Sequence, residues 1–246
     1  MIIKNPEAED IPVLRKLWKQ AFLDTDAFLD RFFSLAFSEE RALVAKEKDQ
    51  LLAGLYWFDC TCEGKPLAYI YAVATDEKYR GQGICKALMA QVHRQMEKEK
   101  KGTILVPAND MLRAFYEKLG YQNFGGIAEM TCVASGMPLP VEKLTANTYA
   151  QRRRGLLPIN SILQEGVFLP FMEANMQFYG GEDWLLAVAN DFAPEFLGDP
   201  AKLPGILKTL QIQKLQVRCP GNAPFAMWRG MEEAICNPGY FAFALD

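Results

Sequence analysis

The chain has 246 residues, of which half are hydrophobic and 23% charged, and its formal net charge is −3. This length and apolar content suit one large domain or two small ones. The slightly acidic balance gives no general attraction to nucleic acid or to an anionic membrane surface. The N-terminus lacks a signal-peptide core, and no apolar run reaches membrane-spanning length, so we expect a cytoplasmic protein.

Strand and helix patterns alternate along the first half of the chain. Apolar residues at spacings of three and four predict helices, and β-branched apolar runs bounded by turn residues predict strands. The resulting order is typical of an α/β protein with a mixed sheet flanked by helices. In chain order we expect a strand at 2–4, helices over 11–22 and 26–37, strands at 42–45, 51–58 and 67–75, a helix over 83–101, a strand at 103–107, a helix over 111–119 and an extended segment at 121–133.

A segment with two prolines and a glycine, Gly136 to Pro140, interrupts this pattern. We therefore place a linker at 134–146, between a first domain at 1–133 and a second α/β domain at 147–246. The second domain is expected to contain helical stretches at 147–157, 161–177 and 203–210, and strands at 184–189, 214–219 and 240–245.

Two segments of the second domain are similar in sequence to segments of the first. Residues 217–222 are similar to residues 104–109, and residues 184–190 to residues 69–75. No glycine loop accompanies the second copy, so we interpret this domain as a decayed repeat. Its helical run also carries Arg152, Arg153 and Arg154. These arginines could meet a phosphate, but a salt-bridged or solvated helix face is the better interpretation.

Few residues suit metal binding or nucleophilic catalysis. The six cysteines are scattered, apart from Cys60 and Cys62, so the paired spacing of a zinc site is absent and we expect no metal. The single histidine, His93, lies within a predicted helix. Any Ser–His or Cys–His pair would have to use it, and we favour a structural role. An aromatic group around Phe28, Phe32 and Phe33 could be core or the wall of an acceptor pocket.

The strand Val73-Ala74-Thr75 is soon followed by the loop Arg80-Gly81-Gln82-Gly83-Ile84-Cys85, which leads directly into a helical pattern. A glycine-bearing loop between a strand and a helix presents backbone N–H groups and a positive helix end to an anion. The stretch therefore predicts a site for a phosphate group or for a ligand that carries one.

This loop is similar to the Arg/Gln-x-x-Gly-x-Gly/Ala loop of the GNAT family of N-acetyltransferases. The segment from Asn109 to Tyr116 also fits the family in order and spacing, so the resemblance covers roughly residues 1–133. It implies a GNAT-type central sheet, acetyl-CoA as co-substrate, and Tyr116 as the general acid that protonates the departing thiolate. The coenzyme-binding residues that it implies are Val73, Ala74, Thr75, Arg80, Gly81, Gln82, Gly83, Ile84, Cys85 and Asn109.

One position departs from the family loop, because Cys85 stands where glycine or alanine is expected. A cysteine is small enough to keep the phosphate site, although it could weaken it. The start of a helix can also lower the pKa of a thiol, which would make Cys85 redox-sensitive.

The base that deprotonates the acceptor amine is less clearly marked. The stretch from Val73 to Gly81 resembles the enhanced-intracellular-survival branch of the family, in which the terminal carboxylate acts in the site. This resemblance implies Asp246 as the base. Asp76, Glu77 and Glu129 are further candidates, although such carboxylates are more often surface residues.

The resemblance implies an enzyme that moves an acetyl group to the amine of a small molecule or peptide by direct attack. The alternative is a catalytically inactive coenzyme A-binding module that regulates or binds a partner. A nucleotide-binding protein is disfavoured, because the other residues of such fingerprints are absent. We expect no nucleic-acid or membrane partner, and the oligomeric state stays open.

Overall fold

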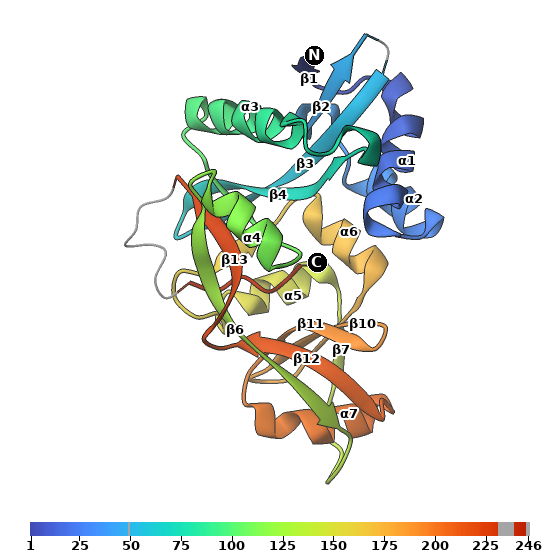
Figure 1. Ribbon diagram of the computed structural model, residues 1–246. Coiled ribbons are helices and arrows are strands. Elements are labelled where there is room, and N and C mark those ends of the chain that lie inside the picture. The colour runs from blue at the N-terminus through green and yellow to red at the C-terminus, as the bar shows by residue number, and fades with distance from the viewer. Residues whose placement is uncertain (49, 231–238, 245–246) are drawn as a thin grey trace.

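The computed structural model describes residues 1–48, 50–230 and 239–244. Within these residues thirteen strands form one continuous sheet, in the order β1-β2-β3-β4-β5-β13-β6-β12-β11-β10-β9-β7, with β8 paired to β3 (Figure 1). Helices lie on both of its faces, so the α/β class and the mixed sheet are confirmed.

The first half of the chain contains the elements that the sequence predicts, in the predicted order. They are β1 (Ile2–Lys4), α1 (Ile11–Phe22), α2 (Asp26–Leu35), β2 (Ala42–Glu47), β3 (Gln50–Cys62), β4 (Lys65–Thr75), α3 (Ile84–Lys98), β5 (Gly102–Leu105), α4 (Asp110–Glu117) and β6 (Gln122–Val133).

Alternation along β3 gives this half of the sheet two apolar faces. Leu55 and Trp57 join the core layer beneath α3. Tyr56 and Phe58 join the layer beneath α1 and α2, where the ring centroids of Trp18 and Tyr56 are 5.2 Å apart. Successive strand residues point to opposite faces, so an uninterrupted apolar strand requires cover on both sides. The helices in Figure 1 supply that cover.

The aromatic residues of α2 belong mainly to this core. Phe32 is 1% exposed and its ring centroid lies 4.5 Å from that of Trp18. Phe28 and Phe33 are partly buried against the same layer. Core packing is therefore the interpretation that the structure favours for this cluster.

Strands β4 and β5 separate partway along their length. They pair in parallel only where Leu67 to Tyr69 lie beside Gly102 to Ile104. Strand β4 continues to Thr75, whereas β5 ends at Leu105. A bulge within β4 shifts its register against β3, and Ala72 adopts a φ of 48° there. The result is a notch between the two strands, which we call the β4–β5 notch.

The second half of the chain repeats the topology of the first. Strands β9, β10 and β11 form an antiparallel meander, and α7 then leads to β12, which is parallel to β11. This is the order of β2, β3, β4, α3 and β5, so the interpretation as a degenerate repeat is confirmed. The elements are β7 (Glu142–Leu144), α5 (Ala146–Arg153), β8 (Ile162–Gln164), α6 (Phe168–Asn175), β9 (Gln177–Gly180), β10 (Leu185–Ala189), β11 (Phe192–Leu197), α7 (Leu203–Leu210), β12 (Lys214–Pro220) and β13 (Ala223–Arg229).

The two halves share the sheet. Strand β13 lies between β5 and β6 of the first half, and β8 pairs with residues 60–62 of β3. The proposed division into domains at residues 133 and 147 therefore stays a prediction, because strands of the second half pair with strands of the first.

Three expectations for the second half were wrong. The helix predicted over 161–177 is β8 followed by the shorter α6, because Ile162 to Gln164 pair with a distant strand. We expected residues 184–190 to correspond to β4, but they contain β10. The counterpart of β4 is β11, because β11 is the strand that precedes the crossover helix. The predicted strand at 240–245 is, within the described residues, a single parallel bridge between Tyr240 and Ser161.

Candidate functional site

The β4–β5 notch opens into a cavity of about 460 Å³. Strand β4 supplies one wall, the segment after β5 and helix α4 supply another, and the second half of the chain contributes two side chains. The lining residues are Trp18, Phe22, Asp24, Ile70, Tyr71, Ala72, Val73, Leu105, Val106, Pro107, Ala108, Leu112, Tyr116, Arg218 and Phe225.

The glycine loop lies between the end of β4 and the start of α3. Gly81 and Gly83 both have a φ of 78°, which side chains other than glycine rarely adopt, and a Cβ at either position would meet no atom within 4 Å. Gly83 is the N-cap of α3, and the Arg80 Nε donates to the Thr75 carbonyl at 3.2 Å. Ile84 is the first residue of the helix. The loop therefore presents the N-terminus of a fifteen-residue helix to open space, as an anion site requires.

Cys85 does not have the reactive thiol that its position suggested. Its side chain packs partly buried against the apolar layer beneath α3. Burial raises the pKa of this thiol to about 11, so it is neutral at pH 7. The expectation of a lowered pKa is wrong, because burial of the side chain raises the pKa instead.

Asn109 and Tyr116 sit at opposite ends of α4. The Asn109 Oδ1 accepts a hydrogen bond from the Leu112 amide at 2.9 Å, which makes Asn109 the N-cap of the helix. Tyr116 is 6% exposed and lines the cavity together with Leu112. Tyr116, which the sequence pattern suggests as the proton donor, therefore lies on the wall of the β4–β5 notch.

Of the other predicted site residues, Val73 lines this cavity, whereas several others do not. Ala74 and Thr75 continue β4 beyond it, and Gln82 donates to the Lys78 carbonyl at 3.5 Å within the glycine loop. Asp246 lies outside the described residues.

The three alternative carboxylates do not line the cavity. Asp76 caps the turn before the loop by accepting from the Lys78 amide at 2.9 Å, and Glu77 is exposed. Glu129 pairs with Arg218 at 3.2 Å. Sequence reasoning missed the carboxylate that does line the cavity, Asp24, because its turn was interpreted only as the start of α2.

His93 has a structural role. Its Nε2 lies 3.0 Å from the Tyr121 hydroxyl, and the side chain is buried beneath α3. Burial, and after it the positive charge of Arg229, lower the pKa of His93 to about 4. The residue is therefore neutral at pH 7 and engaged away from the cavity.

This shift predicts a pH-dependent stability. The unfolded chain binds a proton near pH 6.5, whereas folded His93 does so only near pH 4. The free energy of unfolding should therefore fall as the pH drops from 6.5 towards 4, by up to about 1.4 kcal/mol per pH unit, and this loss should end below the folded pKa. Because the chain has one histidine, urea unfolding of His93→Gln should be flat between pH 6.5 and 5. An unchanged slope in the variant would assign the effect to other groups.

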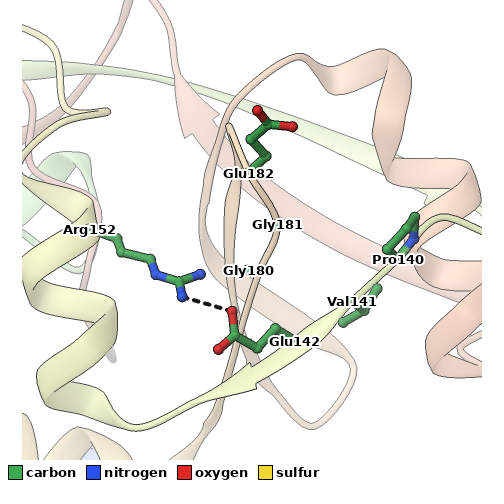
Figure 2. A pocket seen from close by; sticks show the side chains of 7 residues that line it. All are labelled: Pro140, Val141, Glu142, Arg152, Gly180, Gly181 and Glu182. Atoms are coloured by element: carbon green, nitrogen blue, oxygen red, sulfur yellow. Dashed lines mark ion pairs between the residues drawn. The ribbon is translucent and has the colours of Figure 1, made fainter.

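A second cavity, of about 610 Å³, lies in the second half (Figure 2). Arg152 points into it towards Glu142, at 2.7 Å, and Glu182 points away from that pair. Arg153 and Arg154 also have carboxylate partners, Glu195 and Glu165. The arginine triplet is thus salt-bridged as expected, although Arg153 is buried rather than solvated.

The described residues give no sign of a metal centre or a membrane span. Among them there is no group of three or more His, Cys, Asp or Glu side chains that could hold a metal ion. In the same part of the chain, every helix is too short or too polar to cross a membrane.

Comparisons with known proteins agree with this fold. The family model of the acetyltransferase (GNAT) domain matches residues 3–124. A GCN5-related N-acetyltransferase from Anabaena variabilis is 16% identical, with a TM-score of 0.71 over 93% of this chain and 72% of that one. A second, from Kribbella flavida, is 14% identical, with a TM-score of 0.69 over 92% of this chain and 70% of that one.

Eis1 from Mycobacterium abscessus is also similar in fold. It is 10% identical, with a TM-score of 0.65 over 93% of this chain and 73% of that one. No curated protein matches the chain. These identities establish the fold alone, while the family model identifies the domain. Residues 3–124 therefore form a domain of the GNAT acetyltransferase family, within a two-part fold like that of Eis1.

Proposed function

We propose that this protein is an acetyl-CoA-dependent N-acetyltransferase that acts on the amine of a small molecule or peptide. One observation carries the proposal. The glycine loop follows β4 after one short turn at residues 77–79, and β4 lines the same cavity as Tyr116. The strand that lines the cavity together with the phenolic proton donor therefore leads towards the anion site, an arrangement that suits a thioester carrying phosphate groups.

The residues present fit coenzyme A. We assign the pyrophosphate to the loop from Arg80 to Cys85, where the two glycines leave open space at the start of α3. The pantetheine arm is assigned to Val73, Ala74 and Thr75, because β4 extends beyond its pairing with β5 there. A main-chain edge of this kind can hydrogen-bond an extended ligand as a further strand would. Asn109 is assigned a contact with the coenzyme in addition to its capping role.

Acetyl-CoA supplies a thioester that an amine attacks directly. Tyr116 then protonates the departing thiolate as general acid. Direct attack is supported by the state of the candidate nucleophiles, since burial raises the pKa of Cys60 and Cys85, and His93 is engaged with Tyr121.

We propose Asp246 as the base. The support comes from the segment before it, because residues 240–244 are buried in the core between the two halves. The Phe241 ring centroid lies 4.9 Å from that of Tyr69 on β4 and 6.4 Å from that of Phe225, a cavity residue. The chain thus approaches the cavity shortly before Asp246.

Thermal unfolding with added ligands tests the binding part of the proposal. Acetyl-CoA at about a hundred times its Kd should stabilise the protein by about 2.7 kcal/mol, whereas ATP and NAD should have no effect. An equal shift with ATP would support a nucleotide-binding protein instead, and no shift with acetyl-CoA would refute the proposal.

Release of free thiol in the presence of an amine panel tests the catalytic part. Turnover is expected in the full chain, and deletion of residues 244–246 should abolish it while the acetyl-CoA shift persists. Normal turnover after this deletion would exclude Asp246 as the base. Binding without any turnover would indicate the inactive coenzyme A-binding module.

A further inference from the structure

Arg218 brings a positive charge into the cavity from the second half of the chain. It lies on β12, where its neighbours Val217 and Cys219 pack in the apolar layer beneath α7. Because strand residues alternate between faces, Arg218 points to the opposite face, and there it lines the cavity. Its side chain is 7% exposed.

The guanidinium group of Arg218 is held in place by its neighbours. Glu129, its cross-strand partner on β6, accepts hydrogen bonds from Nε and Nη2 at 3.2 Å, both through Oε1. The Arg218 Cζ lies 4.1 Å from the ring centroid of Phe225 and 4.9 Å from that of Phe192. A guanidinium has several N–H donors in a planar fork and can serve two carboxylates at once. Its partial desolvation strengthens its attraction to an anion.

Several of the other residues that line the cavity are aromatic, and one is acidic. Trp18, Phe22, Tyr71 and Phe225 give apolar walls, and Asp24 is fixed by a 2.8 Å hydrogen bond from the Trp18 Nε1. The cavity thus combines one cation and one carboxylate with aromatic surface. A polycationic amine would place like charge beside the arginine, whereas a zwitterion with an apolar body would meet complementary groups.

We propose that the acceptor is an amino acid with an apolar side chain, and that Arg218 binds its carboxylate. The inference rests on the proposed acetyl transfer and names its substrate class. The aromatic walls contact the side chain of the acceptor. Asp24 attracts the amino group of the acceptor, which is an ammonium ion when the acceptor enters the cavity.

L-Phenylalanine and 2-phenylethylamine test the proposal, because they differ only by the carboxylate. Steady-state turnover with saturating acetyl-CoA should give phenylalanine a kcat/KM at least about tenfold higher, since charged hydrogen bonds contribute most. In Arg218→Gln the KM for phenylalanine should rise about tenfold or more, while the constants for phenylethylamine stay within about twofold.

Two further variants separate recognition from folding. Glu129→Gln keeps an oxygen acceptor that can hold Arg218 but removes the neighbouring negative charge, so it should lower the KM for phenylalanine and leave phenylethylamine unchanged. Arg154→Gln is the matched control, since Arg154 is exposed and pairs with Glu165 away from the cavity; it should change neither substrate.

Three outcomes would overturn the proposal. The first is equal use of the two amines by the unmodified protein. The second is a parallel loss for both in Arg218→Gln, which would give Arg218 a structural role or a partner within the chain. The third is acetyl-CoA stabilisation without acetylation of either amine, which would refute this acceptor class and leave coenzyme binding intact. Failure of acetyl-CoA to stabilise the protein would instead refute the proposed function itself.

Discussion

Replacement of Tyr116 with phenylalanine should lower kcat by about 10²- to 10⁴-fold, the usual contribution of a general acid. The change removes only the hydroxyl group. The ring, which lies 5.7 Å from that of Tyr121 and 5.3 Å from that of Phe115, keeps its packing. Affinity for acetyl-CoA should stay within about twofold, because the proton is needed when the thiolate leaves and not when the coenzyme binds.

Tyr121→Phe is the matched control. Tyr121 is also buried and contacts Tyr116, but its hydroxyl lies beside His93 and it does not line the cavity. Thiol release should therefore fall sharply in Tyr116→Phe and remain near the unmodified level in Tyr121→Phe. Acetyl-CoA should raise the melting temperature of both. Full turnover in Tyr116→Phe would mean that another group, or water, protonates the thiolate.

The part of the site that could be predicted is local in sequence. The glycine loop needs only a strand end, two residues with positive φ and a helix start, and all of these lie within residues 73–88. Tyr116 was proposed from its spacing to Asn109, and the structure has both on one short helix, Asn109 as its N-cap. Such signals survive in a single sequence because neighbouring residues determine them.

The side of the cavity that we assign to the acceptor could not be predicted, because distant segments assemble it. Phe225 reaches the notch because β13 inserts between β5 and β6, and Arg218 reaches it from β12, which pairs with β6. No local pattern signals either pairing. Strand β8 was missed for the same reason, since its three residues are ordered by pairing with β3. Pairings between distant strands depend on tertiary packing rather than on propensity.

For Cys85, by contrast, the local motif gave the wrong expectation for the side chain. Its position at the start of α3 suggested an acidic thiol, yet helix periodicity turns the side chain into the layer that covers Leu88 and the sheet. Desolvation therefore sets its pKa. A local motif predicted the backbone of this loop correctly but not the environment of each side chain.

The largest loss of stability is expected where the second half of the chain buries an ion pair. Arg153 donates to both oxygens of Glu195, at 2.6 and 2.9 Å, and the two side chains are 3% and 0% exposed. Tyr149 donates to the same carboxylate at 2.9 Å, and Arg153 also donates to the Ile162 carbonyl at 3.1 Å. We expected Arg153 on a solvated or salt-bridged helix face, so its burial is a finding of the structure.

Arg153→Met should lower the free energy of unfolding by about 3–5 kcal/mol, because it leaves the Glu195 charge buried without its cation. Urea unfolding at pH 7 measures this loss. The double variant Arg153→Met/Glu195→Gln should recover at least half of it, since glutamine is neutral and still accepts from Tyr149. Arg154→Met, which breaks an exposed pair, should cost no more than about 1 kcal/mol. If the double variant were as unstable as the single one, lost packing rather than the unpaired carboxylate would be the cause.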